Sequence, residues 1–179
     1  MTTLADLFAD YRPRSAEESI DVERMRALAE THDPWSRTVE LHATASALIV
    51  DAASGRVLLR WHVRQHGWLQ VGGHGDPGET DPLAIAVREA TEETGLNDLT
   101  PWQAVPIHLV IVPVPANHRE PAHEHADIRF VFRTDHPERA RPESPDAPIT
   151  WLSVADAIDA TTEDNLRETL TRLAALSDR

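Results

Sequence analysis

Residues 72–96 read GGHGDPGETDPLAIAVREATEETGL, a glycine-rich turn that leads into a segment with helical periodicity. Asp81 is a favoured N-cap residue, Pro82 suits the first position of a helix, and Gly95 suits its C-terminal stop. Between these limits, apolar residues recur at helical spacing and form one stripe, namely Leu83, Ala86, Val87 and Ala90. The stretch therefore predicts a short helix that buries one side and presents the other to solvent.

The polar side of this expected helix carries Arg88, Glu89, Glu92 and Glu93. Residues three and four positions apart share a helical face, so the three carboxylates converge. Clustered carboxylates raise one another's pKa unless a cation neutralises them. Arg88 offsets part of the charge, and a hard divalent cation such as Mg²⁺ or Mn²⁺, which prefers oxygen ligands, would offset the rest. A solvated acidic helix has a similar pattern, but the glycines before this one favour a place where backbone approaches a ligand.

The same stretch resembles the Nudix box, the signature of hydrolases that act on nucleoside diphosphates linked to another group. Gly73 and Glu79 fit the first interval of the box, and residues 88–96 fit its whole second half. Residues 80–87 separate Glu79 from Arg88, one residue more than the box allows, which puts the role of Glu79 in doubt.

The resemblance implies a metal site and a reaction. The ligands of Mg²⁺ or Mn²⁺ would be the carboxylates of Glu89, Glu92 and Glu93, with the Gly73 carbonyl as a further ligand. Glu92 or Glu93 would act as the general base, and Arg88 would orient the carboxylates. The implied activity is metal-dependent hydrolysis of a phosphoric anhydride in a small substrate, nucleoside diphosphate-linked or related. A non-catalytic Nudix-fold module that binds a ligand or regulates is the alternative.

A second pattern lies in residues 123–130, which read HEHADIRF. In a strand, alternate side chains share a face, so His123, His125, Asp127 and Arg129 line one side while apolar residues line the other. We expect these four residues to bind substrate: Arg129 could pair with a phosphate, and the histidines could bind metal or shuttle protons. A solvated strand face is the plainer interpretation. With Leu41-His42-Ala43-Thr44, the pattern resembles a recurring Nudix subgroup over residues 38–175.

The His-x-His-x-Asp spacing also resembles the dinuclear zinc motif of metallo-β-lactamase-type hydrolases. That motif continues with a histidine where this chain has Ile128, and it needs further histidine ligands downstream, where only His136 follows. The sequence therefore does not predict that zinc centre.

Two other residues are candidate substrate contacts. His74 follows the Gly-Gly turn and either contacts substrate or metal or forms a backbone hydrogen bond. Arg60 belongs to a small basic cluster that either meets phosphates or balances an acidic surface. His42 and His108 are assigned structural hydrogen bonds.

Composition limits the classes of function. The 179 residues carry a net charge of −13, which opposes general nucleic-acid binding because polyanions bind basic surfaces. The absence of cysteine excludes disulfides, thiolate metal sites and the cysteine on which Nudix-fold isomerases rely. No apolar run reaches membrane-spanning length, and the N-terminus lacks signal-peptide character, so we expect a cytoplasmic protein.

The order of strand and helix signals predicts an α/β fold, a Nudix-like α/β/α sandwich with a mixed sheet. Residues 1–37 form an N-terminal helical extension in this interpretation, and residues 38–179 form the Nudix domain. Ser15 and Glu18 give a capping-box signal for the second of two short helices. These helices either pack on the catalytic fold, which we favour, or form a homodimer contact or part of a lid.

Overall fold

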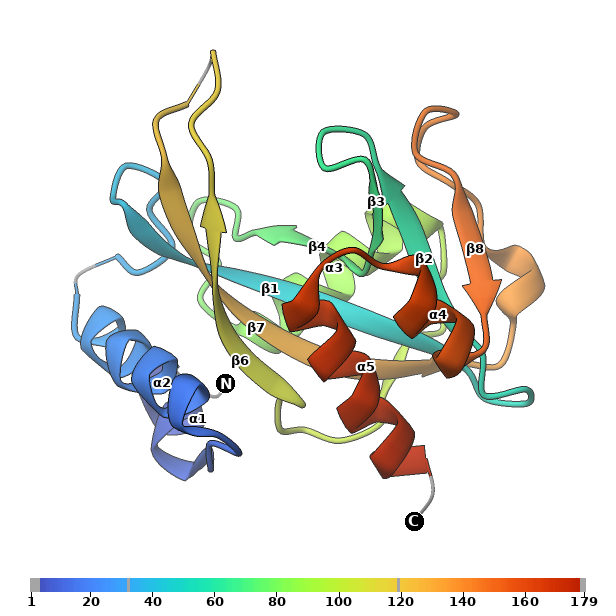
Figure 1. The fold of residues 1–179 in the computed structure, drawn as a ribbon, viewed down its shortest axis with the longest axis horizontal. Helices are drawn as coiled ribbons and strands as arrows, with labels where there is room; N and C mark the ends of the chain where they lie inside the picture. Colours follow the sequence, from blue (N-terminus) through green and yellow to red (C-terminus); the bar gives the residue numbers. More distant parts are fainter. Residues whose placement is uncertain (1–3, 32, 119, 178–179) are drawn as a thin grey trace.

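The computed structural model describes residues 4–31, 33–118 and 120–177, and a mixed sheet of eight strands organises them (Figure 1). The strands are β1 (Leu41–Asp51), β2 (Val57–His62), β3 (Gly67–Leu69), β4 (Val71–His74), β5 (Thr100–Pro101), β6 (His108–Val114), β7 (His123–Thr134) and β8 (Ile149–Leu152). The long central strands β1 and β7 pair in parallel, and the other pairs are antiparallel. The predicted mixed sheet is confirmed.

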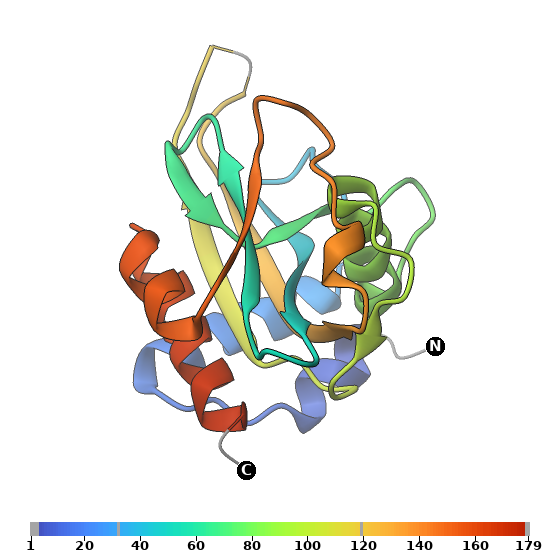
Figure 2. The same cartoon turned by 90° about the vertical axis from the view of Figure 1, so that its right-hand side faces the viewer.

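Helices cover both sides of this sheet (Figure 2). On one side lie α1 (Leu4–Asp10), α2 (Ala16–Ala29) and α3 (Pro82–Thr94), against a core that includes Ala45 of β1 and Phe130 of β7. On the other side lie α4 (Val154–Ala160) and α5 (Asp164–Ser177), against a core that includes Leu48 and Val131. We call these sides the α3 face and the α5 face. The predicted α/β/α sandwich is confirmed, with one additional 3₁₀ turn at Pro137–Arg139.

The N-terminal helices share the main hydrophobic core. Phe8 of α1 and Val22, Met25 and Leu28 of α2 are buried, and they belong to the same cluster as the α3 face of the sheet. Ser15 caps α2 by accepting a hydrogen bond from the Glu18 amide. The prediction that these helices pack on the fold is therefore confirmed. Within the described residues, no helix has the length and apolar character needed to cross a membrane.

Helix α3 begins and ends at the predicted residues. The Asp81 side chain accepts hydrogen bonds from the amides of Leu83 and Ala84, and Gly95 takes a left-handed φ of 70°. Ile85, Ala86 and Ala90 are buried beneath the helix, while Leu83 and Val87 are partly buried against the same core. Because this side is held against β1 and β4, the glutamates of α3 project from a fixed support.

Candidate active site

The Gly-Gly turn lets β4 lie directly against its neighbours. A Cβ atom on Gly73 would lie 2.6 Å from the carboxyl carbon of Glu89. A Cβ on Gly72, whose φ is 147°, would lie 2.6 Å from the backbone carbonyl oxygen of Ala45. Real Cβ atoms do not approach so closely, so only glycine lets the Glu89 carboxylate rest on the strand.

Arg88 connects the carboxylates of the site. Its guanidinium donates to Glu79 at 2.8 Å, to Glu89 at 2.9 Å, to Glu92 at 3.0 Å and to the His74 carbonyl at 2.9 Å. The hydrogen bonds with Glu79 are the main cause of a raised pKa for Arg88. Glu79 thus pairs with Arg88 even though the interval between them is one residue longer than in the Nudix box. The longer interval therefore does not prevent this pairing.

Glu93 is the most buried of the three α3 glutamates. One of its oxygens accepts the Gly72 amide at 3.0 Å, and the other lies 3.1 Å from a guanidinium nitrogen of Arg60. Burial raises the pKa of Glu93 to about 7, although Arg60 and the Gly72 amide act to lower it. Burial likewise raises the pKa of Glu89, against the opposing effect of Arg88. Glu93 can therefore exchange a proton near neutral pH, and a cation bound beside either group would favour its charged form.

The donor set of α3 fits a hard divalent cation. Glu89, Glu92 and Glu93 offer only carboxylate oxygens, and the backbone of Gly73 lies against Glu89. In this structure Arg88 holds Glu89 and Glu92, and Arg60 holds Glu93, so arginine nitrogens balance the acidic charge. A cation with oxygen preference would take over that role by binding the same carboxylate oxygens.

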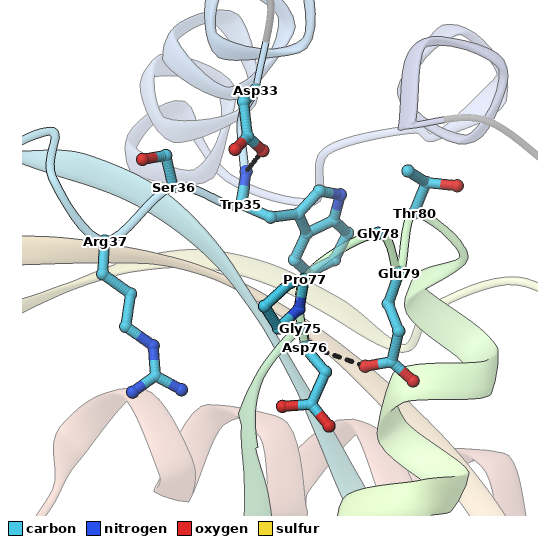
Figure 3. A pocket seen from close by; sticks show the side chains of 10 residues that line it. All are labelled: Asp33, Trp35, Ser36, Arg37, Gly75, Asp76, Pro77, Gly78, Glu79 and Thr80. Carbon is cyan, nitrogen blue, oxygen red and sulfur yellow. Dashed lines mark hydrogen bonds between the residues drawn. The ribbon is translucent and has the colours of Figure 1, made fainter.

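A pocket of about 580 Å³ opens beside this site, between residues 33–37 and the loop at residues 75–80 (Figure 3). Trp35, which is buried, and Arg37, which is exposed, come from the segment before β1. Glu79 lines the pocket and also pairs with Arg88. Residues 33–37 were not among the predicted site residues, because only the fold brings this segment to the loop before α3.

Four histidines gather on the α5 face of the sheet. His42 of β1 lies beside His125 of β7 in the parallel register, and His74 lies at the end of β4. The Nε2 atoms of His42 and His74 are 3.1 Å apart, and those of His123 and His125 are 3.2 Å apart. Burial and the neighbouring rings lower the pKa of His74 to about 3 and that of His125 to about 4. The structure thus unites three candidate residues with His42, whose Nδ1 forms the expected structural hydrogen bond with the Val39 carbonyl.

Asp127 and Arg129 form a buried ion pair on the same face. The Arg129 Nε donates to Asp127 at 2.7 Å, and the remaining guanidinium nitrogens donate to Asn165 and Thr169 of α5. Arg129 is 2% exposed and Asp127 is 4% exposed. The prediction that Arg129 pairs with a substrate phosphate is therefore wrong for this structure, because α5 covers the guanidinium and satisfies it. The same burial removes Asp127 from the candidate substrate contacts.

The fold and site agree with a comparison against protein families, in which residues 40–173 match the NUDIX domain. The chain belongs to the Nudix family. The resemblance carried by residues 72–96 is thereby confirmed over most of the chain.

Individual relatives match this Nudix protein only at low sequence identity. A curated protein of Lactococcus lactis subsp. cremoris, named "Probable DHNTP pyrophosphohydrolase", is 29% identical over 106 residues, which make up 59% of this chain and 62% of that protein. The match therefore spans less than two thirds of that relative's length. A solved NUDIX-family hydrolase from Clostridium perfringens is 26% identical with a TM-score of 0.58, covering 75% of this chain and 97% of the other. The C. elegans Ap4A hydrolase in a binary complex shares the fold, with 20% identity, a TM-score of 0.62, and 76% and 97% coverage.

Proposed function

We propose that this Nudix protein hydrolyses a phosphoric anhydride bond in a small, nucleotide-derived substrate with the help of Mg²⁺ or Mn²⁺. The observation that carries the proposal is the set of three α3 carboxylates, one of which rests on Gly73, where a Cβ atom would displace it. Family membership supports it. The ligands would be Glu89, Glu92 and Glu93, with the Gly73 carbonyl beside them.

Each residue of the site then has a chemical task. Glu89, Glu92 and Glu93 would hold the cation, which when bound would polarise the phosphoryl group and neutralise its charge. Glu93 would accept a proton from the attacking water, because it is the least exposed of the three α3 carboxylates and its oxygens are held by the Gly72 amide and Arg60. Arg88 is a positioning residue, because its guanidinium joins Glu79, Glu89 and the His74 carbonyl.

The substrate is proposed to approach from the pocket beside Glu79. Its volume of about 580 Å³ lies in the range of small-molecule sites, roughly 300–1,000 Å³. Trp35 offers an apolar wall for an organic group, and the exposed Arg37 offers a positive charge for a phosphate. Arg60 is a further candidate contact, because its buried Nε has no hydrogen-bond partner among the described residues.

A substrate panel tests the activity. Dihydroneopterin triphosphate and Ap4A are included because relatives are named for them, together with nucleotide sugars and ADP-ribose. The purified chain is incubated with Mg²⁺, with Mn²⁺ or with EDTA, and phosphate, pyrophosphate and nucleotide products are separated by chromatography. We expect at least one compound to be cleaved at an anhydride bond only when the divalent ion is present. Tight binding without turnover of any compound would instead identify a ligand-binding Nudix module.

A further inference from the structure

The histidine cluster lies on the opposite side of β4 from the α3 carboxylates. It contains His42 from β1, His74 from β4, and His123 and His125 from β7. One ring nitrogen from each of His42, His74 and His125 lies within 4.8 Å of the other two. Nearby carboxylate oxygens are already engaged, since Asp127 accepts from Thr44, Ser46 and Arg129. The cluster therefore offers imidazole nitrogen in place of oxygen.

Backbone contacts orient two of these rings. The Nδ1 atom of His42 lies 2.9 Å from the Val39 carbonyl oxygen, and Nδ1 of His123 lies 3.0 Å from the Pro121 carbonyl oxygen. A carbonyl can only accept, so Nδ1 carries the proton in both rings and Nε2 keeps a lone pair. Each lone pair points at another imidazole, that of His74 or that of His125. Metal-binding histidines are held in this way, with the second nitrogen donating to a carbonyl.

The distance within each of the two histidine pairs is close to that found around a tetrahedral ion. Two imidazole nitrogens that bind one Zn²⁺ at about 2.0–2.1 Å lie about 3.3–3.4 Å apart. The two Nε2–Nε2 distances here are 3.1 Å and 3.2 Å. All four residues stand on or at the ends of paired strands, so the backbone already brings the rings together.

We propose that His42, His74 and His125 bind a transition-metal ion of the Zn²⁺ class, with His123 as the fourth ligand. Imidazole ligands favour Zn²⁺, Co²⁺, Ni²⁺ and Cu²⁺, whereas Mg²⁺ prefers oxygen. The ion would take the place of the Nε2 protons of His74 and His125, each of which moves to Nδ1 of the same neutral ring, and it would tie the end of β4 to β1 and β7. Because the His74 carbonyl accepts a hydrogen bond from Arg88, this link also fixes one contact of the carboxylate site. The site does not depend on the proposed hydrolysis.

Cobalt provides a spectroscopic test on the full-length protein. After treatment with a chelator and buffer exchange, the protein is titrated with Co²⁺ and the visible absorption of tetrahedral, nitrogen-coordinated cobalt is recorded. Zn²⁺ binding is measured by calorimetry, and its stoichiometry by elemental analysis. We expect the cobalt spectrum to saturate at one tetrahedral ion per chain, and we expect Zn²⁺ to abolish it. The absence of a cobalt spectrum together with no Zn²⁺ uptake would overturn the proposal.

Three variants locate the ion. His125→Ala should weaken Zn²⁺ binding by more than about 100-fold, because even second-shell partners of a metal are worth about 10–100-fold. His136→Ala, which removes a partly exposed histidine that contacts Glu138, should bind Zn²⁺ as the parent protein does.

Glu93→Gln should also keep the cobalt spectrum. Loss of the spectrum in Glu93→Gln but not in His125→Ala would place the ion on α3 and refute the proposal. Circular dichroism checks that His125→Ala folds. If it does not fold, His123→Ala replaces it. Unchanged Zn²⁺ affinity and an unchanged cobalt spectrum in His123→Ala would count against the four-histidine site.

Discussion

Gly73 and His74 are consecutive residues of β4, yet they belong to two different chemical environments. Gly73 lies against Glu89 on the α3 face, where arginines and carboxylates are partly open to solvent: the side chains of Arg88 and Glu92 are 23% and 56% exposed. On the α5 face, His74 meets other histidines, and the Asp127–Arg129 pair beyond them is buried and fully hydrogen-bonded. Charges that are open to solvent can contact a ligand, whereas charges that are buried and hydrogen-bonded stabilise the fold. The α3 face should therefore control activity, and the α5 face stability.

Glu93→Gln should have the largest effect, a loss of hydrolysis rate. It tests whether the α3 face controls activity. Losing the proton acceptor should lower the turnover rate by about 10²–10⁴-fold. The free energy of unfolding should be unchanged or higher, because a neutral amide costs less to bury than a carboxylate. Initial rates on a substrate found with the panel, and thermal unfolding curves, measure both quantities.

Glu143→Gln is the matched control for Glu93→Gln. Glu143 pairs with the same Arg60 at 3.3 Å, but its side chain is 55% exposed and it lies outside α3. We expect a rate close to that of the parent protein. Equal rates for all three proteins would show that the α3 carboxylates do not carry the chemistry.

Asp127→Asn tests whether the α5 face controls stability. The substitution leaves the Arg129 guanidinium buried without its counter-charge, and such losses cost about 3–5 kcal/mol. Urea unfolding measures this loss, and the rate per folded molecule should be unchanged. Asp164→Asn is the control, since it removes an Asp–Arg contact of 2.6 Å whose aspartate is 95% exposed and should cost less than about 1 kcal/mol. A stable Asp127→Asn protein without activity would reverse the assignment of the two faces.

The ion pair between Glu18 of α2 and Arg172 of α5 predicts that the stability of the fold depends on pH. Burial alone would raise the pKa of Glu18, but hydrogen bonds from Arg172 and Tyr11 lower it from 4.5 to about 2. A carboxyl with a depressed pKa stabilises the folded state above its unfolded pKa and loses this contribution as pH falls. Stability should therefore decline between about pH 4.5 and pH 2, as measured by urea unfolding.

Glu18→Gln should be less stable at neutral pH and should flatten this acid dependence. The control is Glu168→Gln, because Glu168 binds the same Arg172 at 2.8 Å while half exposed. If the two variants have the same acid profile, the buried pair is not the origin of the effect.

Asp81→Ala should have the smallest effect, a modest loss of stability. It tests whether stability and activity can be separated at the start of α3. Loss of the N-cap should cost about 1 kcal/mol, because the amides of Leu83 and Ala84 lose their acceptor. The hydrolysis rate should not change. Asp81→Ser retains a capping oxygen and should recover most of the loss in thermal unfolding, and a fall in rate with Asp81→Ser would show that the cap does more than start the helix.

Local patterns predicted those parts of the protein that depend on neighbours in sequence. The N-cap at Asp81, the left-handed stop at Gly95 and the alternation of His125 and Asp127 with apolar residues each follow from spacing alone. The partners of Arg129 could not be predicted, because Asn165 and Thr169 are 36 and 40 residues away on α5. For the same reason the sequence did not reveal that residues 33–37 form a pocket wall.

The sequence by itself determined which side chains α3 presents and which residues of β7 share a face, because helical and strand periodicities are properties of the backbone. Only the tertiary structure decided what meets those side chains. The parallel register of β1 and β7 brought His42 to His125, and the packing of α5 enclosed Arg129. Packing of strands and helices distant in sequence decides whether a charge is exposed to a ligand or neutralised within the fold.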